Sequence, residues 1–187
     1  MKKNYFLKTQ ILVTSIFSIA IWSLLTWNHF HGGVPRHHIL AREDLPEISN
    51  WWGGLLLPAL TWLVLFRIQK RENLAQTQEL GFLNIPNKIW FAFLGALLLS
   101  ICLSVFFTLG HNGMSGYLLM SVLFISLFFP VYRAECLLGF VVGITYTFGA
   151  TLPTGIGSIL ATMGFLIYNL IRPGLLFLFN FLKSIKN

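Results

Sequence analysis

Long apolar runs that end at charged or turn-forming residues dominate the chain. Six such runs follow one another: Thr9–Trp27, Trp51–Phe66, Ile89–Leu109, Met114–Tyr132, Cys136–Leu152 and Ile156–Ile171. A helix needs about 20 apolar residues to cross roughly 30 Å of hydrocarbon, and in lipid only a helix or a closed barrel satisfies its own backbone hydrogen bonds. We therefore predict an all-α, polytopic integral membrane protein with six transmembrane helices, forming one domain over residues 1–187.

The composition supports this fold class and excludes others. Hydrophobic residues make up 56% of the 187 residues and charged residues only 10%. Soluble domains carry about 25% charged residues, so this chain has too few charges to cover a water-soluble globule. Two cysteines are also too few to build a disulfide scaffold.

The basic residues sort onto one side of the predicted topology. With the N-terminus in the cytoplasm, the outer segments contain only Arg36 and Arg42 of the 13 Lys and Arg residues. The positive-inside rule then places both termini in the cytoplasm. We expect a bacterial inner-membrane protein whose partner is the lipid bilayer, with its net charge of +7 drawn to anionic lipid. The basic stretches lack interleaved stacking aromatics, which argues against nucleic-acid binding.

A further apolar segment, residues 173–185, follows Arg172 and includes Lys183. It either extends the sixth helix past a kink at Pro173 or forms a separate helix on the inner membrane surface. We expect the interfacial helix, because an extended sixth span would draw Arg172 into hydrocarbon.

All five histidines fall on the outer side of this topology. Together with one carboxylate, they form a set of candidate metal ligands: His29, His31, His37, His38, Asp44 and His111. Imidazole and carboxylate groups bind transition metals and transfer protons near neutral pH. Zinc is the expected metal, with copper and iron as alternatives. Without a metal, His37, Asp44 and His111 are candidates for general acid–base catalysis.

We expect the connection between the first two spans to be an ordered, histidine-rich loop. Gly32-Gly33 permits a turn, and residues His37–Leu45, which lie between two prolines, can form about two helical turns. That helix would place His37 and Asp44 on one face. The spacing matches no recognised metal motif, so the alternative is that these side chains only solvate a loop near lipid headgroups.

A serine motif follows His111. Its residues Gly113-Met114-Ser115-Gly116 resemble the GxSG nucleophile motif of rhomboid intramembrane proteases, and six spans with a large first outer loop are similar to that family. The resemblance implies that Ser115 is a catalytic nucleophile. The chain departs from the family because no histidine follows His111, which leaves His111 as the available base. Alternatively, the glycines shape a turn and Ser115 caps the fourth span.

The predicted fifth span carries Gly139 and Gly143 at GxxxG spacing. Small residues at this spacing let helices approach closely in lipid, so we expect this face to pack against another helix. At the start of the same span, we expect Glu135 to pair with Arg133 at the cytoplasmic edge.

Three functions remain open. The leading hypothesis is an outward-facing His/carboxylate site that binds a metal or performs acid–base catalysis on a lipid or small extracytoplasmic substrate. The second is a small transporter or channel, with the histidine-rich loop as its vestibule and a polar path from Thr154 to Thr145 and Tyr146. The third is a non-catalytic partner that assembles with itself or with another membrane subunit.

Overall fold

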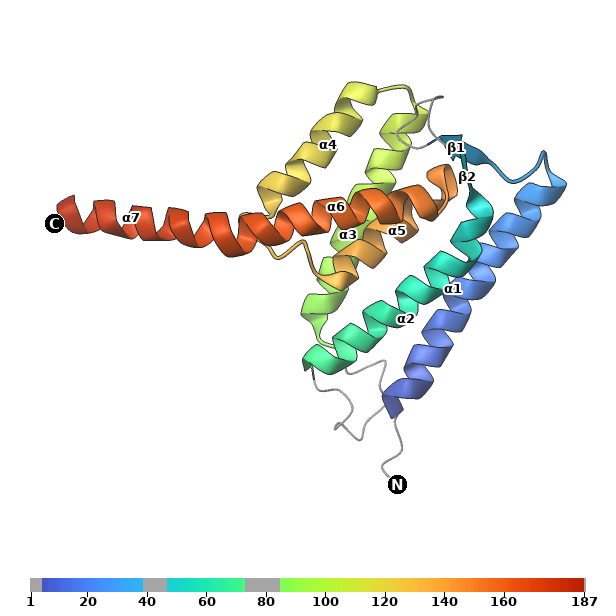
Figure 1. Ribbon diagram of the computed structural model, residues 1–187, viewed down its shortest axis with the longest axis horizontal. Coiled ribbons are helices and arrows are strands. Elements are labelled where there is room, and N and C mark those ends of the chain that lie inside the picture. Colours follow the sequence, from blue (N-terminus) through green and yellow to red (C-terminus); the bar gives the residue numbers. More distant parts are fainter. Residues whose placement is uncertain (1–4, 39–46, 73–84, 187) are drawn as a thin grey trace.

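The computed structural model describes residues 5–38, 47–72 and 85–186, which are mostly helical (Figure 1). The α-helices are α1 (Tyr5–Phe30), α2 (Gly53–Glu72), α3 (Asn87–Thr108), α4 (Asn112–Ile125), α5 (Ala134–Phe148), α6 (Thr151–Leu166) and α7 (Arg172–Lys186). A 3-10 turn, η2 (Asn50–Trp52), precedes α2, and a π-helical segment, η4 (Ile167–Ile171), joins α6 to α7. Strands β1 (Arg36–His38) and β2 (Glu47–Ser49) pair antiparallel between α1 and α2.

The helices α1 to α5 run alternately up and down one helical body (Figure 1). At one end, α2 finishes beside the starts of α3 and α5, where Arg71 binds Glu135. We call this the charged end. At the opposite end, which we call the hairpin end, the Phe107 ring near the end of α3 meets Phe148 at the end of α5, with 4.6 Å between ring centroids. The β1–β2 hairpin lies at this second end, beside the start of α2 (Figure 1).

The α3–α5 contact is the most extensive helix pair, and glycines on α5 make it possible. A Cβ atom at Gly139 would lie well inside contact distance of the Phe93 carbonyl oxygen and 3.2 Å from the Leu97 nitrogen. At Gly143 it would lie 2.8 Å from the Leu97 carbonyl oxygen. The expectation that this GxxxG face packs against a helix is confirmed, and its partner is α3.

Four segments of the described chain are long and apolar enough to cross a membrane: Phe6–Phe30, Asn50–Glu72, Asn87–Thr108 and Thr151–Leu178. The other two predicted crossings fall on shorter apolar helices, Gly113–Ile125 and Ala134–Phe148. The chain is therefore a helical protein with membrane-spanning character. The fourth predicted run, Met114–Tyr132, is the one that deviates most, because α4 ends at Ile125 and turns follow it as far as Arg133.

The first two residues of the segment expected to form two helical turns are in a strand instead. His37 and His38 lie in β1, opposite Ile48 and Glu47 of β2. A two-turn helix gains few hydrogen bonds for its nucleation cost, whereas the pairing with β2 satisfies the backbone groups of β1 that face β2. Residues 39–46, which include Asp44, lie outside the described residues.

The C-terminal segment takes the extended path and does not break at Pro173. The helix runs from α6 through η4 into α7, which projects away from the rest of the body (Figure 1). A proline inside an α-helix clashes with the carbonyl four residues earlier, which here belongs to Asn169. Asn169 lies in the π segment, whose wider turn leaves room for the Pro173 ring. The Arg172 guanidinium lies over the Tyr168 ring, 4.5 Å from its centroid.

Candidate functional site

The histidine side chains that the structure describes lie at the hairpin end, each in its own surroundings. The ring of His31 stacks on Trp27, with 3.8 Å between centroids, and its Nδ1 lies 2.9 Å from the Trp27 carbonyl oxygen. His29 meets Trp51 edge-on. His111 is exposed at the N-cap of α4.

The predicted metal centre is therefore not assembled from these side chains. Within residues 5–38, 47–72 and 85–186, no group of three or more His, Cys, Asp or Glu is placed to hold a metal ion. Asp44 and the side chains of His37 and His38 fall outside what the structure describes. Binding of zinc, copper or iron by the outer loop stays a prediction.

Ser115 lies in the first turn of α4, and the residue is 7% exposed. Its hydroxyl has no hydrogen-bond partner in the described part of the chain. The Ser115 N–H donates to the His111 carbonyl oxygen at 3.2 Å, so His111, and not Ser115, is the cap residue. A serine nucleophile needs a base within hydrogen-bond reach of its hydroxyl, and the exposed His111 ring does not make that bond.

The hydroxyl groups invoked for a transport path bond to their own helices. Thr145 donates to the Val141 carbonyl oxygen at 2.6 Å, and Thr154 donates to Ala150 at 2.7 Å. The Tyr146 side chain is 83% exposed on the outer surface of α5. A polar passage along these three residues stays a prediction.

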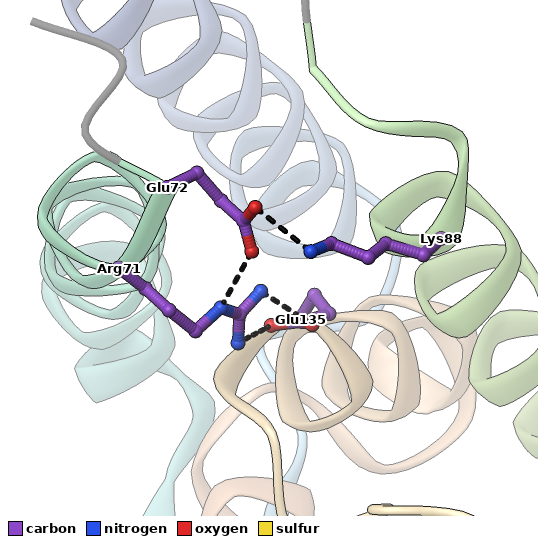
Figure 2. Close-up of polar contacts among 4 residues, drawn as sticks. All are labelled: Arg71, Glu72, Lys88 and Glu135. Carbon is purple, nitrogen blue, oxygen red and sulfur yellow. Dashed lines mark hydrogen bonds and ion pairs between the residues drawn. The ribbon is translucent and has the colours of Figure 1, made fainter.

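A network of four charged side chains joins α2, α3 and α5 at the charged end (Figure 2). Its members are Arg71, Glu72, Lys88 and Glu135. The Arg71 guanidinium donates to both carboxylate oxygens of Glu135, at 2.9 and 3.2 Å. Its Nε lies 3.1 Å from one oxygen of Glu72, whose other oxygen lies 2.8 Å from Nζ of Lys88.

Glu135 is the buried member of this network, with a side chain only 2% exposed. Its partner is Arg71, and not the neighbouring Arg133 that the sequence suggested. Because charges leave water at high cost, a buried carboxylate needs both a counter-charge and hydrogen bonds, and the bidentate Arg71 supplies both. The pair therefore fixes the end of α2 against the start of α5.

A cavity of about 570 Å³ lies beside this network, between α3, α4, α5 and α6. Apolar side chains form most of its wall, among them Leu99, Ile125, Leu137, Phe140 and Leu160. Two cationic side chains, Lys88 and Arg133, line it as well. Phe91 and Phe129, which are 76% and 66% exposed, also line it, so the cavity opens at the surface of the helical body.

The cavity exists because small residues and a turning segment leave room between the helices. Gly95 on α3 faces open space, since a Cβ atom there would meet nothing within 4 Å. The chain after α4 bends through Pro130 and Val131, both of which line the cavity. Sequence reasoning missed this site. The available signal was Gly95-Ala96 on an apolar helix that starts beside Lys88.

Comparisons of the chain with protein-family models, curated proteins and solved structures gave no significant match. The geometry of the cavity and of the charge network is therefore the basis for a functional proposal.

Proposed function

We propose that this chain is an integral membrane protein that binds a lipid-like amphiphile in the cavity between α3, α4, α5 and α6. The observation that carries the proposal is the cavity itself, about 570 Å³ in volume, with apolar walls and a surface opening beside Phe91 and Phe129. Ligand sites commonly enclose about 300–1,000 Å³ of mostly apolar space with a few polar groups that orient the ligand. An acyl chain suits such walls, and the opening gives it a route from the bilayer.

In this proposal α4 and α5 also lie within the bilayer, which gives six crossings. Exposed apolar side chains on α4, such as Met120 and Phe124, support contact with lipid. The short helix α5 contacts α2, α3 and α6, so other helices surround much of it and lipid covers only the rest. The positive-inside rule then places the charged end and both termini on the cytoplasmic side. The proposed location is the bacterial inner membrane.

Gly95→Leu tests the proposal by filling the cavity. The new side chain enters open space and should leave the backbone in place. We expect the variant to retain about tenfold less lipid than the wild type, because overpacking an occupied site costs about 1–3 kcal/mol. Native mass spectrometry of protein purified in a mild detergent measures the lipid that remains bound.

Gly155→Leu on α6 is the matched control. A Cβ atom at Gly155 also meets nothing within 4 Å, and this residue does not line the cavity. The control should retain as much lipid as the wild type. Equal lipid retention in the wild type, Gly95→Leu and Gly155→Leu would contradict the proposal.

A metal-binding or acid–base function at the hairpin end is a second proposal. Its support is one shared location: His29 at the end of α1, His31 directly after α1 and His111 at the N-cap of α4 lie at the end where β1 contains His37 and His38. We expect purified protein to retain zinc after desalting, and His37→Ala and His111→Ala to lower the retained amount, as measured by elemental analysis. Absence of retained metal, with unchanged thermal stability in both variants, would remove this proposal.

A further inference from the structure

The charged residues that line the cavity indicate which headgroup its ligand carries. Lys88 and Arg133 belong to the same wall as the apolar side chains of α3 and α5. Resting on the proposed amphiphile-binding function, we infer that the ligand is an anionic lipid, with an oxyanion headgroup bound by Arg133 and Lys88 and an acyl chain along the apolar wall. The headgroup chemistry is that of a phosphate or a carboxylate.

Arg133 is fixed in the backbone at this place. Its N–H donates to the Pro130 carbonyl oxygen at 3.2 Å, and its own carbonyl accepts the N–H groups of Cys136 and Leu137 at 3.0 and 3.2 Å. These bonds tie Arg133 to the turn on one side and to the first turn of α5 on the other. The base of its side chain is therefore held at the cavity wall, so a ligand has to order the side chain but not the backbone that carries it.

Among the described residues, Arg133 has no counter-ion. Glu135 lies only two residues along the chain, but Arg71 takes both of its carboxylate oxygens. Glu72 is shared between Arg71 and Lys88. The four-residue network is therefore neutral, and no ion pair of Arg133 occurs within the ranges that the structure describes. Of the charges that the structure describes here, one positive charge beside the cavity is therefore left for a ligand.

Lys88 supplies a second contact while it remains in the network. Its ammonium group carries three N–H donors, and the ion pair with Glu72 at 2.8 Å occupies one of them. A headgroup oxyanion with several acceptor positions can bind the remaining donors together with the planar donor set of Arg133. Such charge-assisted bonds would hold the headgroup, whereas the apolar wall contacts only the acyl chain.

The experiment compares lipids of one acyl composition and different headgroups on the full-length protein in detergent. Phosphatidylglycerol is the anionic lipid, phosphatidylcholine the zwitterionic one, oleate the carboxylate probe and inorganic phosphate the probe without an acyl chain. Native mass spectrometry titrations give an apparent affinity for each. We expect the wild type to favour phosphatidylglycerol over phosphatidylcholine by about tenfold, because both lipids carry a phosphate but the choline cation of phosphatidylcholine offsets that charge and repels Arg133 and Lys88.

Variants separate a built headgroup site from general surface charge. Arg133→Gln should bring the two phospholipids to nearly equal affinity, and Arg133→Lys should recover part of the preference. Arg67→Gln removes an exposed cation of α2 that does not line the cavity, so it should keep the wild-type preference. Circular dichroism of each variant checks that the helical fold is retained.

Each result has a defined meaning. Equal affinity of the wild type for both phospholipids overturns the anionic headgroup but leaves the proposed amphiphile binding intact, because the Gly95→Leu comparison tests the latter separately. Equal loss of preference in Arg67→Gln and Arg133→Gln also overturns the headgroup site. Binding of inorganic phosphate as tightly as phosphatidylglycerol would overturn the role of the acyl chain. Tighter binding of phosphatidylglycerol or of oleate, with that preference lost in Arg133→Gln, supports the inference. The preferred lipid then identifies the headgroup as a phosphate or a carboxylate.

Discussion

Gly139→Ala is expected to lower the free energy of unfolding by about 3 kcal/mol, the upper end of the cost of overpacking a buried contact. The added methyl group would collide with the Phe93 carbonyl oxygen and lie 3.2 Å from the Leu97 nitrogen. Both are backbone atoms of α3, which cannot move aside as a side chain can. Relief of the collision requires α5 to shift away from α3. Unfolding by a denaturing detergent, followed by circular dichroism, measures the change.

Gly116→Ala on α4 is the control for this prediction. A Cβ atom at Gly116 meets nothing within 4 Å. Alanine is also the better helix former by about 0.5–1 kcal/mol, so the control should be as stable as the wild type or slightly more so. If Gly139→Ala proves as stable as the Gly116→Ala control, the close α3–α5 contact is wrong.

Arg71→Met should cost about 3 kcal/mol of stability, because removal of one partner leaves a buried charge without compensation. The charge left behind is Glu135, whose side chain is 2% exposed. Glu135→Gln should cost less, since Arg71 is still in contact with Glu72 and partly reaches solvent. The same denaturing-detergent titration measures both variants.

The exposed Arg67, one turn earlier on α2, provides the matched control as Arg67→Met, which should change stability little. A double variant, Arg71→Met with Glu135→Leu, gives a sharper test. Replacement of both members of a buried pair by apolar residues is often close to neutral, so the double variant should recover most of the loss. A double variant as unstable as Arg71→Met alone would show that Glu135 is not the source of the cost.

The helices were predictable where the signal is local. The apolar runs Thr9–Trp27 and Ile89–Leu109 correspond to α1 and α3 within a few residues. The fourth run overestimated α4, because the apolar sequence continues after Ile125 while the helix does not. Pro130 disfavours helical backbone at Phe129, and this local signal was present in the sequence.

The candidate site could not be predicted in the same way, because it depends on how helices are placed relative to one another. Arg71 and Glu135 are 64 residues apart, and only the register of α2 against α5 brings them together. The cavity likewise results from the course of the chain after α4, and no periodic pattern of apolar residues in the sequence predicts that course. The positions of histidine and carboxylate residues in the sequence predicted a site at the hairpin end. In the described structure, the cavity lies near the charged end.

The unbroken helix from Thr151 to Lys186 has a geometric consequence. At 1.5 Å per residue it forms a rod of roughly 54 Å, whereas the hydrocarbon layer is about 30 Å thick. Even at a tilt of about 40°, the upper end of the usual range, only about 39 Å of the rod is immersed. About 15 Å of the rod therefore lies outside the hydrocarbon layer. Leu160 and Ala161 on this same rod form part of the cavity wall. A change of about 10° in the inclination of the rod about this wall therefore displaces the C-terminal tip, about 38 Å away, by roughly 7 Å.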